Sequence, residues 1–231
     1  MKIIIGTHHK TGTNFFSKFL RKLSLEKKIS VWDRGSSPEA ANEPPDWQIY
    51  FDHWSKWVID IDNYEFKGIH SVRHPMSLIY SATLYHCTSK ELWLHDKKDM
   101  YNGRSYADMI NSFPTVEEKL MFEMKGSSRN AILRMLEVAP DSRFCNVRLE
   151  NISHDREMAD LRRAFEFIGI SESDADDWLS IAKTFSLSYA KALPKHSTTG
   201  VSDDWKKYFK DDVELEYRRI FGEAELTLGY D

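Results

Sequence analysis

The first sixteen residues constrain the fold more than any other stretch of the chain. They contain Ile3, Ile4 and Ile5, a β-branched run that is too short for a helix and predicts a fully buried strand at the centre of a parallel sheet. Gly6 ends this run. From Thr13 onward, apolar residues recur at helical spacing with basic residues between them: Phe15, Phe16, Phe19, Leu20 and Leu23. The stretch therefore predicts a buried strand, a tight loop and an amphipathic helix.

The loop between this strand and this helix has the composition of an anion site. It contains, in order, Lys10, Thr11, Gly12, Thr13 and Asn14. A helix that begins in such a loop presents unpaired backbone N–H groups and the positive end of its dipole, and phosphate is the usual occupant. A Walker A loop does not fit, because Gly6 and Gly12 are one residue too far apart and Lys10 precedes the second glycine. The alternative is a surface turn that merely contains a lysine.

Composition limits the class of protein. A chain of 231 residues with no Pro/Gly/Ser linker predicts one domain over residues 1–231, and 32 basic against 36 acidic residues indicate neither nucleic-acid binding nor a basic membrane face. Cys87 and Cys145 lack metal-ligand spacing, which excludes structural zinc and predicts free thiols in a reducing compartment. The first strand begins by Lys2, leaving no room for a signal peptide, and no run reaches the ~20 apolar residues of a membrane span. A soluble cytoplasmic protein is expected.

Further strands and helices alternate along the chain. Strands are predicted at residues 29–32, 47–51 and 68–72, and a fifth is marked by Phe144, Val147 and Leu149. Pro75 opens a helix, and residues 91–137 are predicted to be mostly helical. This order predicts an α/β fold: a single three-layer domain with a central parallel β-sheet flanked by helices.

A second candidate anion contact lies 63 residues after Lys10. Arg73 ends the strand at 68–72, Pro75 follows two positions later, and Ser81 lies about two turns into the next helix. Ligands of α/β proteins bind at this edge of the sheet, where an arginine can hold a phosphate through two parallel N–H bonds and a serine hydroxyl can add a third. The alternative is a strand-to-helix turn with a solvated arginine.

Together, these two motifs resemble those of the sulfotransferases that use 3′-phosphoadenosine 5′-phosphosulfate (PAPS). Lys-Thr-Gly-Thr-Asn at 10–14 is similar to their P-loop-like 5′-phosphosulfate loop, and Arg73 with Ser81 to their 3′-phosphate motif. Segments 80–86, 91–94 and 119–123 also look like parts of a soluble subgroup. The resemblance implies PAPS as cosubstrate, 3′-phosphoadenosine 5′-phosphate (PAP) as product, and no required metal.

The resemblance extends to the C-terminal part of the chain, with departures. Asn146-Val-Arg-Leu-Glu150 resembles a strand end of the family, and Thr184 with Phe185 resembles its adenine-contacting segment, shortened by one residue. The segment that closes over the 3′-phosphate is matched by residues that depart from the family's Arg-Lys-Gly pattern: Lys195, His196, Ser197 and Gly200. The family's dimer motif is absent from Lys206 onward, so the sequence does not decide between a monomer and a dimer.

In-line transfer of a sulfuryl group requires charge stabilisation and a base. The resemblance implies that Lys10 donates to the oxygen bridging phosphate and sulfate. His53 ends the strand before Arg73, a position similar to that of the family's base. The other candidates, His8, His9 and His86, also fit structural roles.

The acceptor is expected to be a small molecule or a carbohydrate that offers a hydroxyl or an amine. An aromatic-walled pocket is expected from residues that flank the site in sequence: Trp32, Trp47, Trp54, Trp57, Tyr85, Trp93 and Tyr101. Two alternatives stay open. One is a P-loop small-molecule kinase that uses residues 57–60 as a Walker B strand, and the other is a non-catalytic PAP-binding protein. Dependence on magnesium would separate the kinase from the sulfotransferase.

Overall fold

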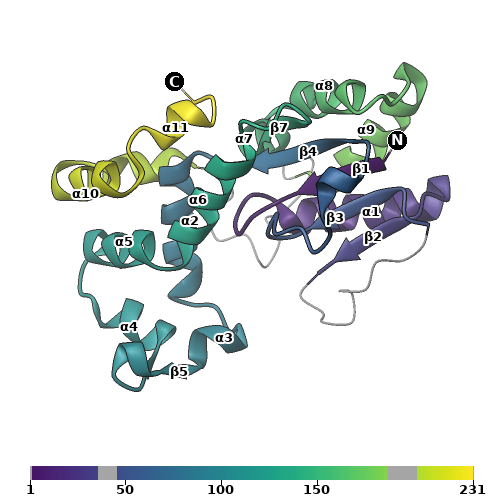
Figure 1. The fold of residues 1–231 in the computed structure, drawn as a ribbon. Helices are drawn as coiled ribbons and strands as arrows, with labels where there is room; N and C mark the ends of the chain where they lie inside the picture. Colours follow the sequence, from purple (N-terminus) through teal and green to yellow (C-terminus); the bar gives the residue numbers. More distant parts are fainter. Residues whose placement is uncertain (1, 36–45, 187–201, 231) are drawn as a thin grey trace. The chain divides into compact units, whose positions relative to one another are not determined.

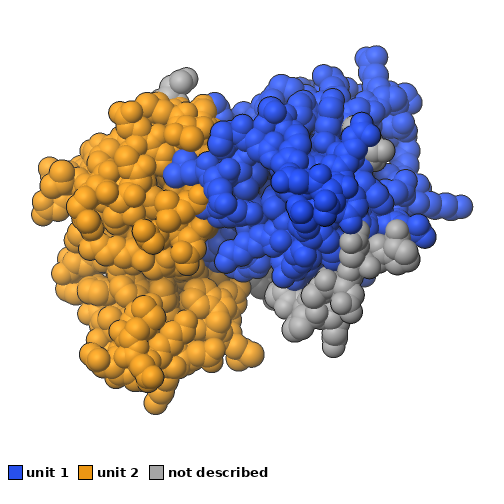
Figure 2. All heavy atoms as spheres, in the orientation of Figure 1, with its two compact units in different colours: residues 1–73, 134–194 blue, residues 74–133, 195–231 orange. Residues whose placement is uncertain are grey.

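The computed structural model describes residues 2–35, 46–186 and 202–230. It divides into two compact units, one formed by residues 1–73 and 134–194 and the other by residues 74–133 and 195–231 (Figure 2). The prediction of a single functional domain over residues 1–231 stays a prediction.

The first unit is built on a five-stranded parallel sheet in the order β2-β3-β1-β4-β7 (Figure 1). Its strands are β1 (Lys2–Gly6), β2 (Val31–Arg34), β3 (Ile49–Asp52), β4 (Phe66–Val72) and β7 (Phe144–Arg148). Ile4 of β1 lies opposite Tyr50 of β3 on one side and Gly68 of β4 on the other. The isoleucine run is therefore the central strand, as its lack of polar residues predicts.

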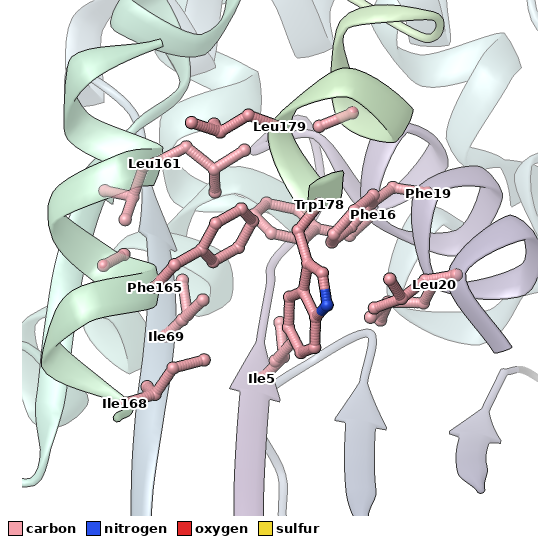
Figure 3. Close-up of a cluster of buried hydrophobic side chains, with 14 of the residues drawn as sticks. Ile5, Phe16, Phe19, Leu20, Ile69, Leu161, Phe165, Ile168, Trp178 and Leu179 are labelled. Atoms are coloured by element: carbon pink, nitrogen blue, oxygen red, sulfur yellow. The ribbon is translucent and has the colours of Figure 1, made fainter. Parts of the chain in front are cut away.

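Helices α1 (Thr13–Lys27), α8 (Ala159–Phe167) and α9 (Glu172–Lys183) cover one face of this sheet. Their apolar side chains pack on alternate strand residues, with Ile5 and Ile69 meeting Phe16, Phe165 and Trp178 (Figure 3). The central parallel sheet flanked by helices confirms the predicted α/β class.

The opposite face of the sheet carries the other alternate residues. Ile4 and Tyr50 pack there with Trp32, Trp47 and Phe144. They are covered by the segment that contains η2 (Ile61–Asn63) and by the end of α6 (Ser127–Val138), whose Val138 joins this cluster. Trp32 and Trp47 are 5% and 1% exposed, so they belong to the core and not to an acceptor pocket.

Several element boundaries differ from the predictions. The second strand begins at Val31 and the third at Ile49, each two residues later than predicted. Leu149 was assigned to a strand but begins α7 (Leu149–His154), because the chain turns into a helix after Arg148. Residues 57–60 do not form a strand; Asp60 instead caps η2, accepting a hydrogen bond from the Asp62 N–H at 3.2 Å. The Walker B interpretation of this segment is therefore wrong.

The described residues of the second unit are mostly helical, and helices make up most of residues 91–137, as predicted. Its helices are α2 (Pro75–His86), α3 (Leu92–His95), α4 (Tyr106–Ser112), α5 (Val116–Lys125), the start of α6, α10 (Asp211–Phe221) and α11 (Ala224–Thr227), with 3-10 turns η3 (Asp99–Tyr101) and η5 (Asp203–Lys207). A short antiparallel pair, β5 (Lys97–Lys98) and β6 (Arg104–Ser105), interrupts them. Capping boxes start two helices, Ser105 with Asp108 at α4 and Thr115 with Glu118 at α5.

The described residues also bear on two compositional predictions. Cys87 and Cys145 are both free, which confirms the expected thiols, and burial raises the pKa of each. Within residues 2–35, 46–186 and 202–230, no helix has the length and apolar character needed to cross a membrane.

Candidate active site

The loop that follows β1 is held in one shape by its own side chains. The Thr11 hydroxyl accepts from the His8 N–H at 2.7 Å and donates to the His8 carbonyl at 3.1 Å. The hydroxyls of Thr7 and Thr13 lie 2.9 Å apart across the base of the loop. Lys10 has φ 64° and Gly12 has φ 97°, both in the left-handed region, which lets the chain reverse tightly before α1.

Gly12 is required here for two reasons. A residue with a β-carbon is strained at φ 97°, and a β-carbon at this position would lie 2.8 Å from Cδ1 of Leu149. We expect Gly12→Ala to lower the free energy of unfolding by about 1–3 kcal/mol in denaturant titrations. Gly103 is a matched control, because its φ is 75° and nothing lies within 4 Å of a β-carbon there. A smaller loss for Gly12→Ala than for Gly103→Ala would contradict the requirement at Gly12.

The start of α1 has features that favour a negatively charged ligand. The Phe15 and Phe16 N–H groups both donate to the Gly12 carbonyl, at 2.9 and 3.1 Å. The N–H groups that precede them at the start of a helix have no acceptor within the helix. The first turn of α1 contains no acidic residue. The positive end of the helix dipole therefore follows directly after the Lys10 loop and is not offset by a carboxylate in the first turn.

Arg73 and Lys10 are brought together, as the sequence predicts. Arg73 follows β4 and is 4% exposed, and its Nη1 donates to the Lys10 carbonyl at 3.2 Å. Ser71, at the end of β4, donates its hydroxyl to the Thr11 carbonyl at 2.6 Å. Strand β4 thus fixes the loop from the side. Ser81 lies buried on α2 in the second unit, and its role beside Arg73 stays a prediction.

His53 lies directly after β3 and is oriented by a carboxylate. Its Nε2 is 2.7 Å from Oδ1 of Asp33 on β2, and the Ser17 hydroxyl donates to the other oxygen of Asp33 at 3.2 Å. Because a carboxylate only accepts, Nε2 of His53 carries the proton and Nδ1 of the neutral ring is left as an acceptor. The imidazole can therefore take up a proton at Nδ1.

The segment that carries His53 passes over the end of β1. The Ser55 hydroxyl donates to the Thr7 carbonyl at 3.1 Å, and a β-carbon on Gly6 would lie 2.5 Å from that hydroxyl oxygen. Trp54 is 47% exposed, and its ring stacks on His9 with 6.3 Å between centroids and a 7° interplanar angle. The residues after β3 and the Lys10 loop therefore form one surface.

Buried Asp52 holds this segment in place. Its carboxylate accepts from the Tyr50 hydroxyl at 2.8 Å, from the backbone N–H groups of Trp54 and Lys56 at 2.8 and 3.1 Å, and from Arg34 at 3.1 Å. Burial and the Asp52 charge raise the pKa of Tyr50, which keeps its hydroxyl a donor.

The remaining predicted cofactor residues stay predictions. Thr184 directly follows α9 and donates its hydroxyl to the Ile181 carbonyl at 2.7 Å. Phe185 packs at the edge of the core, with the Lys22 ammonium 6.0 Å from its ring centroid. The predicted contact of Thr184 and Phe185 with adenine remains untested. Four others lie outside the described residues: Lys195, His196, Ser197 and Gly200.

Two histidines of the initial candidate set have structural roles. His86 is fully buried in the second unit, with its Nδ1 2.8 Å from Oε2 of Glu123. His8 is buried in the loop after β1, where it contacts His70.

A surface pocket of about 340 Å³ lies at the other edge of the sheet. Its lining includes Asp62, which precedes β4, and Asp141, Arg143 and Phe144, which precede or begin β7. These are the amino ends of the strands, whereas Lys10, His53 and Arg73 follow carboxyl ends. Among the described residues, no group of three or more His, Cys, Asp or Glu side chains could hold a metal ion.

No protein-family model matches the chain, and no curated protein matches it. A solved structure does: mouse sulfotransferase SULT7A1 complexed with PAP has a TM-score of 0.63 and 18% sequence identity, over 97% of this chain and 83% of that chain. The two proteins share a fold. At this identity the likeness concerns the fold, and the chemistry must be argued from the residues of the site.

Sequence reasoning missed the residues that position the site. Asp33, Asp52 and Ser71 lie at or next to the carboxyl ends of β2, β3 and β4. The available signal was their place in the sequence, because polar side chains at the ends of adjacent parallel strands gather at one edge of a sheet. For Asp33 this signal was hidden, because the second strand was predicted to end at residue 32 whereas β2 ends at Arg34.

Proposed function

We propose that this protein is a PAPS-dependent sulfotransferase that moves a sulfuryl group to a hydroxyl or amine of a small-molecule or carbohydrate acceptor. The observation that carries the proposal is the contact of buried Arg73 with the Lys10 loop, which leads directly into the start of α1. The fold shared with a sulfotransferase that was crystallised with PAP supports it.

The proposed reaction is an in-line displacement. The acceptor oxygen or nitrogen forms a bond to sulfur while the bond from sulfur to the 5′-phosphate oxygen breaks, and PAP leaves. Lys10 donates to that oxygen as negative charge develops on it, and the backbone N–H groups of residues 12–14 hold the 5′-phosphate. The Thr11 N–H, which the sequence also suggested for this role, instead donates to the His8 carbonyl at 3.1 Å. The acceptor proton passes to Nδ1 of His53.

The 3′-phosphate is assigned to Arg73 and Ser81. An arginine holds a phosphate through two parallel N–H bonds, and a hydroxyl adds a third donor. Arg73 already uses Nη1 to hold the Lys10 carbonyl, so the same side chain would connect the two phosphate sites. Thr184 and Phe185 are proposed to contact the adenine.

Binding of PAP tests the cofactor assignment. We expect calorimetry to show PAP binding that persists in a chelator, and Arg73→Ala to weaken it by at least about 30-fold, because a buried charged donor is lost. Arg21→Ala is the control, since Arg21 is exposed on the same unit. Preference for magnesium ATP that is indifferent to Arg73 would contradict the proposal and favour a kinase. PAP binding without transfer to any acceptor would indicate a non-catalytic binder.

A further inference from the structure

A pair of histidines is buried beneath the Lys10 loop. His8 of the loop is 1% exposed and His70, in the middle of β4, is 0% exposed. Their Nε2 atoms lie 2.8 Å apart, and the two rings meet edge to face with centroids 5.1 Å apart. The reaction proposed above uses neither side chain.

The hydrogen bonds around the pair define which ring nitrogens carry protons. Asn146 on β7 donates its amide N–H to the Ala139 carbonyl at 2.9 Å, so its Oδ1 is the atom that faces Nδ1 of His70, at 2.7 Å. Nδ1 of His70 is therefore protonated and, in the neutral ring, its Nε2 accepts. Nε2 of His8 must then be the donor. The result is one directed chain from His8 through His70 and Asn146 to a backbone carbonyl.

His8 also holds the loop through its backbone. Its carbonyl accepts from the Thr11 N–H at 3.1 Å, from the Thr11 hydroxyl at 3.1 Å and from the Thr13 hydroxyl at 3.2 Å. Its own N–H donates to the Thr11 hydroxyl at 2.7 Å. The His8 side chain thus connects the whole Lys10-containing turn to strands β4 and β7.

The surroundings of the pair disfavour a positive charge. Burial is the main cause that lowers the pKa of His70 to about 4 and the pKa of His8 well below its usual value. Asn146 from β7 acts in the opposite direction, because its hydrogen bond raises the pKa of His70, but burial outweighs it. The other facing groups are the Ser55 hydroxyl, 3.3 Å from Nε2 of His8, and the Arg134 guanidinium of α6, which lowers both pKa values further. Arg134 donates to the Ser55 carbonyl at 2.7 Å.

We infer that the neutral His8–His70 pair is the positioning element that holds the Lys10 loop in its anion-binding shape, and that protonation of the pair sets the acid limit of that shape. The loop's role in PAP binding rests on the function proposed above. The positioning of the loop can be measured without any ligand.

The direction of the pH effect follows from linkage. His70 takes up a proton near pH 4 in the folded protein but near its ordinary value of 6.5 in the unfolded chain. Between these two values the unfolded state binds more protons, so the free energy of unfolding falls as the pH is lowered. Both histidines act in this direction, because His8 is shifted the same way.

Two substitutions at His8 separate the hydrogen bond from the shape of the side chain. Gln has an amide that can donate to Nε2 of His70, whereas Phe fills the space and leaves that buried acceptor unpaired. We expect amide exchange of residues 8–13 to be faster by about 10-fold or more in His8→Phe, and within about threefold of wild type in His8→Gln. His154→Gln is the matched control, since His154 is exposed on the same unit.

Two further measurements distinguish the positioning role of the pair from a general loss of stability. Side-chain ¹⁵N spectra at pH 7 should show His70 protonated on Nδ1 and His8 on Nε2. Between pH 7 and 5, His8→Gln should lose less of its free energy of unfolding than wild type, because one shifted histidine is gone. A charged ring at pH 7, the opposite tautomers, or unchanged loop exchange in His8→Phe would each overturn the inference.

PAP affinity separates this inference from the proposed function. In His8→Phe the dissociation constant for PAP should rise by about 10-fold at pH 7.5, with His8→Gln restoring it to within about threefold. Unchanged affinity in His8→Phe would overturn the positioning role in binding. If wild type itself does not bind PAP, the proposed function is refuted, and loop exchange with the tautomer spectra still decides whether the pair positions the loop.

Discussion

Replacing His53 with alanine is expected to reduce turnover by roughly 10²- to 10⁴-fold, the usual contribution of a positioned general base. The reason is the arrangement around its ring: Asp33 accepts from Nε2 at 2.7 Å, which leaves Nδ1 to receive the acceptor's proton. PAP affinity should change little, because the proposed phosphate contacts come from other residues. Steady-state turnover with PAPS and an acceptor, measured from pH 5 to 9, tests this.

A second substitution controls for the shape of the site around His53. Asp33→Asn keeps the size of the side chain but allows its amide to face Nε2, which favours the wrong tautomer and should give an intermediate loss of turnover. Full activity of His53→Ala across the pH range would remove His53 as the base. Full activity of Asp33→Asn alone would show that Asp33 does not orient the ring.

Lys10→Ala is expected to lower turnover by about 10²- to 10³-fold, as the loss of one preorganised donor to developing charge typically does. Alanine keeps a β-carbon at φ 64°, so the backbone strain at this position is unchanged and the effect reports on the ammonium group. The loss should fall mainly on turnover and less on the dissociation constant for PAP, because the charge that Lys10 meets develops in the transition state.

Lys18→Ala provides the comparison for Lys10, since Lys18 is exposed on α1 and has no proposed contact with the nucleotide. Single-turnover measurements would separate the chemical step from product release. Turnover of Lys10→Ala that matches Lys18→Ala would exclude the proposed role, and an equal loss in turnover and PAP affinity would reassign Lys10 to ground-state binding.

The sequence carries enough information for the central part of the fold. Ile3–Ile5 is apolar on both sides because β1 has a parallel neighbour on each edge and packed residues on each face, and the helical spacing after Thr13 follows from the buried side of α1. The meeting of Lys10 and Arg73 was predictable for the same reason: both follow strands that end at one edge of a parallel sheet.

The supporting contacts could not be derived in the same way. His8 and His70 are 62 residues apart, and their contact depends on strand register and on the Asn146 amide, neither of which leaves a local pattern in the sequence. Asp33 was not assigned to a strand because the predicted boundary of β2 was two residues early. Errors of this size are enough to hide a polar residue at a strand end.

One helix links the folding of this protein to the proposed anion site. Phe16, Phe19, Leu20 and Leu23 of α1 are at most 1% exposed in the core, and the same helix supplies the N–H groups at its start. The donors proposed to bind the phosphate therefore belong to one of the most deeply packed parts of the chain. Heating should abolish anion binding in the same cooperative transition that melts the core, and not in an earlier local one.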